Sequence, residues 1–204
     1  MITNKKTQEE AIKNTFDEWF DTMLAENQEN TIHDIEMLLS ISKANLNDKI
    51  VDFGCGDGRH LFELKKRNFK DLFGIDISEV AIKKAQKIAG QDSSIQFNNK
   101  SFFDFLDECN DAIDLAVFFD FTITLYQDKY IYELITLLLK KITKNGKIFI
   151  ESWNYDFLKK SNCMNYERKY KIKQGEFIDK STCDFNNNYI IFQRKLKKNG
   201  FSDF

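Results

Sequence analysis

The spacing of hydrophobic positions changes several times along the chain, and each change marks a predicted element. From residue 7 to 43, apolar side chains recur every three or four positions, which is typical of helices that bury one face. Further on, short apolar runs alternate with such helical stretches. The predicted strands are residues 49–53, 71–76, 94–98, 113–119 and 147–153, and the predicted helices between them are 59–67, 79–89 and 129–142, the last stopped by Asn145-Gly146.

This alternation predicts a fold class. Strands and helices that follow one another in turn imply right-handed βαβ units and a parallel sheet. After residue 153 the pattern changes to three short strands, 166–173, 176–184 and 189–196, with turn residues between them. We therefore expect an α/β, Rossmann-like, doubly wound and mostly parallel sheet, preceded by N-terminal helices and followed by a C-terminal antiparallel appendage.

The organisation of the chain predicts one domain. Its 204 residues are enough for one substantial core, and no linker, repeat or low-complexity tract interrupts them. We expect a single domain, 1–204, made of N-terminal helices (1–46), a core (47–153) and an appendage (154–204).

Composition narrows the possible partners and compartments. The net charge of −2 argues against a nucleic-acid partner, because phosphate binding needs clustered Lys and Arg. The polar start lacks the apolar core of a signal peptide, and no apolar run approaches the ~20 residues that span a bilayer. Four widely spaced cysteines form no CxxC pair, so we expect no metal site. These features favour a cytoplasmic protein that does not act on membranes.

Glycine is the most informative residue type. The chain has eight glycines, and Gly54, Gly56 and Gly58 follow directly after the first predicted strand. A glycine loop between a strand and a helix lets a ligand approach the backbone closely. A dinucleotide fingerprint would need glycine where Arg59 stands, which disfavours a nucleotide-binding oxidoreductase. The Gly-Lys-Ser/Thr of a P-loop is also missing.

The loop and its surroundings resemble the class I S-adenosylmethionine-dependent methyltransferases. Residues 52–58 read Asp-Phe-Gly-Cys-Gly-Asp-Gly, and the resemblance covers roughly 49–153, about half of the chain. Asp76 lies 22 residues after Gly54, near the ~20 expected for a ribose-binding acid after a glycine turn. The resemblance implies S-adenosylmethionine as cofactor and S-adenosylhomocysteine as product.

By the same resemblance, each part of the cofactor has its own residues. Asp52 would meet the methionine end, Asp76 the ribose hydroxyls and Ile77 the adenine ring. Ser101 stands where the family usually has an acid for the adenine amino group, and Asp104 is the alternative. The implied cofactor-binding set is Asp52, Gly54, Cys55, Gly56, Gly58, Asp76, Ile77, Ser101, Phe102 and Phe119.

Asp120 is the candidate catalytic residue. It follows the fourth predicted strand, near the methyl group in this family, and it would orient an amine or take a proton from a hydroxyl. A turn-forming aspartate without substrate contact is an equal alternative. His60 either faces the substrate or lies behind the groups that do. Phe16, Trp19 and Phe20 either pack in the core or form a lid over the cofactor.

The acceptor is expected to be a small molecule, methylated on nitrogen or oxygen. Amino-methylating nucleic-acid enzymes of this class need prolines after the fourth strand, and this chain has none. Tyr126, Trp153 and Tyr155 would keep water out, and residues 166–196 would roof the pocket or form a homodimer contact. The sequence stops at 199–204, where the family's last hairpin would begin. A catalytically inert S-adenosylmethionine-binding or partner-binding module therefore remains an alternative.

Overall fold

The computed structural model describes residues 4–23, 28–90, 94–152, 160, 166–172, 175–184 and 189–198. The chain divides into two compact units, residues 1–152 and 153–204, and each is described here by itself. The single domain expected from the sequence stays a prediction. In the described part of the chain, no helix combines the length and the apolar character that crossing a membrane requires.

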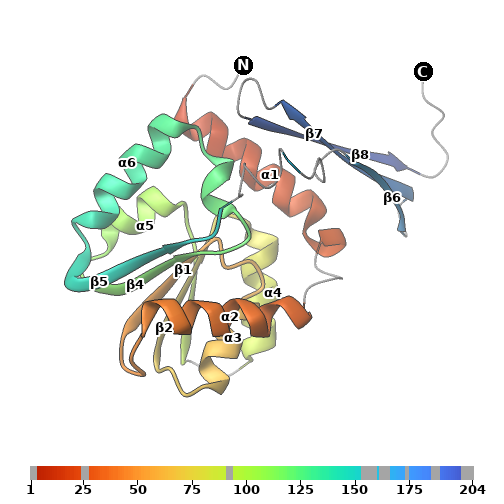
Figure 1. Ribbon diagram of the computed structural model, residues 1–204. Helices are drawn as coiled ribbons and strands as arrows, with labels where there is room; N and C mark the ends of the chain where they lie inside the picture. Colours follow the sequence, from red (N-terminus) through yellow and green to blue (C-terminus); the bar gives the residue numbers. More distant parts are fainter. Residues whose placement is uncertain are drawn as a thin grey trace. The chain divides into compact units, whose positions relative to one another are not determined.

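The first unit is built on a parallel five-stranded sheet in the order β3-β2-β1-β4-β5, shown in Figure 1. Chain order runs outward from β1 to β3 and then returns to place β4 on the other side of β1. This reversal confirms the predicted doubly wound α/β fold. The strands are β1 (Lys49–Phe53), β2 (Asp71–Asp76), β3 (Ile95–Asn99), β4 (Ile113–Phe118) and β5 (Ile142–Ile150).

Helices cover both faces of this sheet. Successive side chains of a strand point to opposite faces, so Ile50 of β1 packs into one core cluster with Leu61, while Val51 packs into the other with Phe102. The described helices are α1 (Lys5–Met23), α2 (Gln28–Ser42), α3 (Arg59–Lys66), α4 (Glu79–Ala89), α5 (Phe102–Glu108), the 3-10 helix η2 (Thr122–Leu125) and α6 (Asp128–Leu139).

The predicted end of the last long helix is wrong. The sequence predicted a helix to residue 142 and a stop at Asn145-Gly146, but α6 ends at Leu139 and β5 already begins at Ile142. Gly146 lies inside that strand. A Cβ there would meet the carbonyl oxygen of Ile113 at 2.9 Å, beside a register shift between β4 and β5. This glycine therefore allows close backbone approach and is not a turn signal. The fifth strand ends at Ile150, earlier than predicted.

The second unit is an antiparallel three-stranded sheet. Its strands are β6 (Tyr166–Ile172), β7 (Gly175–Asp184) and β8 (Tyr189–Lys198), in the order β6-β7-β8. The predicted antiparallel appendage is thereby confirmed.

Candidate active site

The candidate site lies where the strand order reverses. The carboxyl ends of β1 and β4 are neighbours in the sheet, with Asp52 paired to Val117. The glycine loop follows β1, and Phe119 and Asp120 follow β4. In doubly wound sheets, ligands bind in the crevice at this reversal. The topology therefore brings the predicted cofactor loop and the predicted catalytic residue to one edge.

A small cavity of about 40 Å³ opens at this edge. Gly54, Asp76, Ile77 and Phe102, all in the predicted cofactor set, line it together with Ile12, Phe16, Thr122, Leu125 and Tyr126. The other predicted residues, Asp52, Cys55, Gly56, Gly58, Ser101, Phe119 and Asp120, lie around the cavity without lining it.

The backbone conformation and the close neighbours of Gly54 require glycine at this position. Its φ is +85°, in the left-handed region that side chains disfavour, and its N–H donates to the Ile75 carbonyl over 2.7 Å. A Cβ at Gly54 would lie 2.3 Å from the Thr122 methyl carbon of η2. The glycine therefore lets the segment after β4 close down on the loop after β1.

Asp52 is a buried acid with an unsatisfied oxygen. Its side chain is 2% exposed, and its Oδ2 has no hydrogen-bond partner among the described residues. Burial raises its pKa from 3.8 to about 8, and the nearby carboxylates of Asp120 and Asp76 add to this rise. An unpaired carboxylate in such a place is costly, so the position favours a cationic or hydrogen-bond-donating ligand. The ammonium of a methionine moiety fits it.

The Asp76 carboxylate accepts hydrogen bonds from the loop after β1 and can accept a further bond from a ligand. Its Oδ2 accepts from the Gly56 N–H over 2.9 Å, and its Oδ1 accepts from the Ser78 N–H over 2.8 Å. Burial raises its pKa even so, because these two bonds offset only part of the desolvation. A carboxylate has about four acceptor positions, so acceptor capacity stays available for a ribose hydroxyl beside the bonds from the backbone.

The predicted adenine end is arranged by Ser101. This buried residue caps the start of α5, and its hydroxyl accepts from the Asp104 N–H over 3.1 Å. The Asp104 side chain is exposed. Phe102 is buried on the cavity wall, as expected for a residue that covers an adenine edge. Asn99 donates to the carbonyls of Asp76 and Ile77, which fixes the backbone beside the cavity.

A polar network that the sequence did not reveal lies behind the loop. Arg59 donates to Thr31 over 2.5 Å and to Asp120 over 2.7 Å. His60 is 3% exposed, its Nε2 lies 3.1 Å from the Asp34 carboxylate, and its ring stacks on Phe119 with centroids 3.9 Å apart. Burial lowers the pKa of His60, so its neutral form is favoured. His60 thus lies behind the site, where it supports Phe119.

The backbone at Asp120 is held in an uncommon conformation. The φ angles of Asp120 and Phe121 are 50° and 59°, in the left-handed region. The Asp120 N–H donates to Glu151 Oε2 over 2.9 Å. Burial raises the pKa of Glu151, and the charges of Asp120 and Asp34 raise it further. Glu151, through the Asp120 N–H, and Arg59, through the Asp120 carboxylate, thus fix the turn that follows β4.

Cys55 is a core residue. It is 4% exposed, and its sulfur would meet a Cβ placed on Gly74 at 2.7 Å. Burial raises the pKa of the thiol, which keeps it protonated and unreactive.

Helix α1 forms one wall of the cavity. Ile12 and Phe16 line it, Gln8 donates to the Leu125 carbonyl over 2.8 Å, and Asp17 accepts from the Ser78 hydroxyl over 2.6 Å. Of the two alternatives for the N-terminal aromatics, Phe16 thus takes the covering position. The side chains of Trp19 and Phe20, and residues Trp153 and Tyr155, lie outside the described part of the structure.

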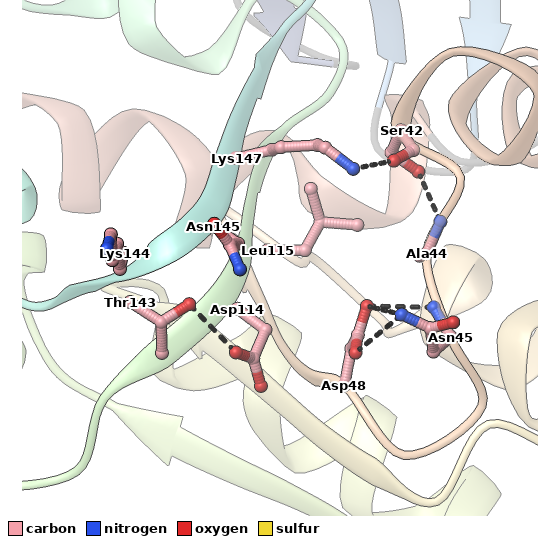
Figure 2. Close-up of a pocket in the computed structure, with 10 residues that line it drawn as sticks. All are labelled: Ser42, Ala44, Asn45, Asp48, Asp114, Leu115, Thr143, Lys144, Asn145 and Lys147. Atoms are coloured by element: carbon pink, nitrogen blue, oxygen red, sulfur yellow. Dashed lines mark hydrogen bonds between the residues drawn. The ribbon is translucent and has the colours of Figure 1, made fainter.

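A further cavity lies at the opposite edge of the sheet. It holds about 450 Å³ near the amino ends of β4 and β5, as Figure 2 shows. Its polar groups bond to one another, with Thr143 donating to Asp114 over 2.9 Å and Lys147 donating to the Ser42 carbonyl. It lies away from the glycine loop, and we do not assign the chemistry to it.

Comparison with known proteins identifies the family of the chain. A methyltransferase domain model matches residues 44–199. A carboxy-S-adenosyl-L-methionine synthase from Nautilia profundicola is 30% identical over 184 residues, which cover 83% of this chain and 77% of that protein.

Solved structures share the fold. An S-adenosylmethionine-dependent methyltransferase from Clostridium acetobutylicum matches with a TM-score of 0.59 and 16% identity over 91% of this chain and 80% of its own. The plantazolicin methyltransferase BpumL, solved with S-adenosylhomocysteine and a substrate analogue, matches with a TM-score of 0.57 and 22% identity over 78% of this chain. This chain spans 64% of the BpumL chain.

The family prediction is therefore confirmed by three agreeing lines: the strand order, the glycine loop at its reversal and the domain match over most of the chain. S-adenosylmethionine is the cofactor that goes with this family and fold. The chain belongs to the methyltransferase domain family, in its class I, S-adenosylmethionine-dependent form.

Proposed function

We propose that this protein transfers a methyl group from S-adenosylmethionine to a nitrogen or oxygen of a small molecule. The observation that carries the proposal is the buried, unpartnered Asp52 carboxylate beside the glycine loop, at the point where the sheet reverses. The cofactor supplies a methyl group on a sulfonium, which is already activated. The residues of the site then have to bind, align and exclude water.

Asp52 and Asp76 hold the two polar ends of the ligand in this proposal. Asp52 binds the methionine ammonium, which supplies the partner its Oδ2 lacks. Asp76 receives the ribose hydroxyls on the acceptor positions left by Gly56 and Ser78. Ile77 and Phe102 provide apolar contact for the adenine. Since the cavity holds only about 40 Å³, Ile12 and Phe16 of α1 have to shift to admit the ligand.

Asp120 faces the acceptor. Two bonds fix the position of Asp120: its carboxylate accepts from Arg59, and its backbone N–H donates to Glu151. The Asp120 side chain is nevertheless 57% exposed. A held but accessible carboxylate can orient an amine or accept a proton from a hydroxyl. The mild net charge and the absence of proline after β4 support a small acceptor.

Calorimetry with S-adenosylhomocysteine tests the cofactor assignment. Asp76→Asn keeps a polar side chain of the same size but loses the charge that strengthens bonds to the ribose. We expect binding to weaken by about 1.5–3 kcal/mol, the range for hydrogen bonds to a charged group. Asp71→Asn, at the other end of β2, is the matched control and should leave affinity unchanged. Unchanged affinity in Asp76→Asn would refute the ribose assignment.

An acceptor screen tests the reaction. The purified protein is incubated with S-adenosylmethionine and candidate amines and alcohols, and the products are identified by mass spectrometry. Formation of S-adenosylhomocysteine with a methylated acceptor supports the proposal. Binding without turnover across the screen would point to the inert module. The similarity to the Nautilia profundicola synthase over 83% of this chain favours one second candidate, carboxylation of the cofactor itself. In that reaction the methyl carbon bonds to the carboxyl group of an added carboxylic acid, and the methyl proton passes to the remainder of that acid, so the screen includes carboxylic acids as donors. That reaction would appear as a heavier S-adenosylmethionine.

A further inference from the structure

Two carboxylate oxygens of the described residues are buried without a hydrogen-bond partner. One is Asp52 Oδ2, which the proposed function uses, and the other is Oε1 of Glu9 on α1. Buried acceptors are nearly always paired, so each exception calls for a physical explanation. Glu9 lies on the helix that closes the cofactor cavity, one turn before Ile12, which lines that cavity. An unused acceptor therefore stands at the edge of the proposed cofactor site.

The surroundings of Glu9 are those of the predicted adenine end. Glu9 lines a cavity of about 420 Å³ together with Ile77, Asn99 and Ser101. Burial raises the pKa of Glu9, while the Ser101 hydroxyl and Lys5 oppose the rise. Lys5 itself is directed to Glu133, with Nζ 2.7 Å from Oε1. The Glu9 carboxylate thus adjoins the very position where an acid was expected and Ser101 stands.

We propose that Glu9 accepts a hydrogen bond from the 6-amino group of the cofactor's adenine, in place of the missing acid at Ser101. The inference rests on the proposed function, because it presumes that the cofactor's adenine lies beside Ile77 and Phe102. Asp104, the alternative considered from the sequence, lines the same cavity, but its side chain is exposed. The buried Glu9 oxygen gains more from a donor than the exposed Asp104 carboxylate does, because it has lost its water.

This contact gives specificity for the base. A carboxylate only accepts hydrogen bonds, so it pairs with an amino group and is repelled by a carbonyl oxygen at the same position. It also links recognition of the base to the closing helix. Gln8 and Asp17 anchor α1 on the loops after β4 and β2, so Glu9 reaches the adenine only while α1 is docked.

The experiment compares two ligands in three proteins by calorimetry. The ligands are S-adenosylhomocysteine and its analogue with hydrogen in place of the 6-amino group. The proteins are the wild type, Glu9→Ala and the control Glu18→Ala, which removes the same charge from an exposed position of α1 that does not line this cavity. We expect Glu9→Ala to weaken binding of S-adenosylhomocysteine about tenfold or more. The analogue should bind wild type and Glu9→Ala equally, and Glu18→Ala should behave like wild type with both ligands.

Equal losses for the two ligands in Glu9→Ala, or no loss for either, would overturn the assignment of Glu9 to the amino group. Thermal unfolding without ligand supplies a second readout. Glu9 is half-buried and the Ser101 hydroxyl bonds to its carboxylate, but its Oε1 is buried without a partner. The loss of the Ser101 contact and the relief of that buried oxygen oppose each other, so the melting temperature should change little, whereas a structural role would lower it clearly. Failure of the proposed cofactor site looks different, because the wild type would then bind neither ligand, and failure of methyl transfer alone appears as binding without turnover in the acceptor screen.

Discussion

The Arg59 guanidinium donates to the Asp120 carboxylate over 2.7 Å, which joins the start of α3 to the turn after β4. The Asp120 side chain is 57% exposed, and solvent-exposed ion pairs contribute little to stability. The same arginine reaches Thr31 and lies 3.6 Å from the Asp34 carboxylate, so it is itself held from α2. Its main effect is therefore to fix the direction of Asp120.

Replacing Arg59 by alanine should impair turnover more than folding. Small misplacements of a reacting group cost up to about 100-fold in rate, so we expect methyl transfer to fall by about 10- to 100-fold. The unfolding free energy should change by less than about 1 kcal/mol, as for an exposed pair. Arg67→Ala, which removes an arginine paired with Glu63 on the same helix, is the control and should keep full turnover.

Asp120→Asn separates charge from shape. Asparagine tolerates the left-handed backbone that Asp120 adopts, so folding and cofactor affinity should be preserved. If Asp120 accepts a proton, turnover should fall by about 100- to 10,000-fold. Full turnover in Asp120→Asn would leave it the role of a turn residue, and steady-state kinetics with the screened acceptor decides between the two.

The Asp52 pKa predicts how stability depends on pH. The folded protein holds the Asp52 proton up to about pH 8, whereas the unfolded chain releases it near 3.8. Between these values the folded state binds more protons, so stability falls as pH rises, by at most about 1.4 kcal/mol per pH unit from this group. Asp52→Asn cannot ionise. Urea unfolding should show its advantage over wild type growing from pH 5 to 8, and a constant difference would contradict the shifted pKa.

Two glycines with positive φ give a matched pair. Gly90 has φ +62° and open space around its missing Cβ, so Gly90→Ala should cost only the backbone strain, about 1–3 kcal/mol. Gly54→Ala adds a collision with Thr122, and overpacking costs about 1–3 kcal/mol more. Thermal unfolding should rank the two accordingly. Equal losses would mean that η2 moves away without cost.

Removing residues 153–204 tests the predicted roof over the pocket. Residues 1–152 form a compact unit that contains every proposed cofactor contact. We expect this fragment to fold and to bind S-adenosylhomocysteine with unchanged affinity by calorimetry, because those contacts are all retained. Methyl transfer should be lost if residues 166–196 shield the acceptor. Full activity of the fragment would exclude them from the mechanism.

The sequence revealed those parts of the site that depend on local order. Asp52, the glycine loop and Asp76 each follow a strand directly, and parallel strands deliver such residues to one edge. Glu9 and Asp34 were not foreseen, because their positions depend on how α1 and α2 pack against loops far along the chain. The His60–Asp34 contact, for example, joins residues 26 apart.

The sequence analysis did not predict α5 and placed the end of α6 wrongly, and each error has a physical reason. Helix α5 spans seven residues, too short for a periodic pattern, although Ser101 followed by Asp104 is a capping signal that would have indicated its start. Asn145-Gly146 resembles a turn because Asn-Gly is common in turns. Here the glycine is required by the passing carbonyl of Ile113, a tertiary contact that no local pattern discloses.

The anchoring of α1 also sets an order of events during synthesis. Its polar contacts reach Ser78, Leu125 and Glu133, so α1 has no docking surface until these later residues have left the ribosome. The sheet must assemble before the helix can settle. Helix α1 is therefore made well before the surface on which it docks, and a nascent chain stalled before residue 125 would carry an exposed Phe16.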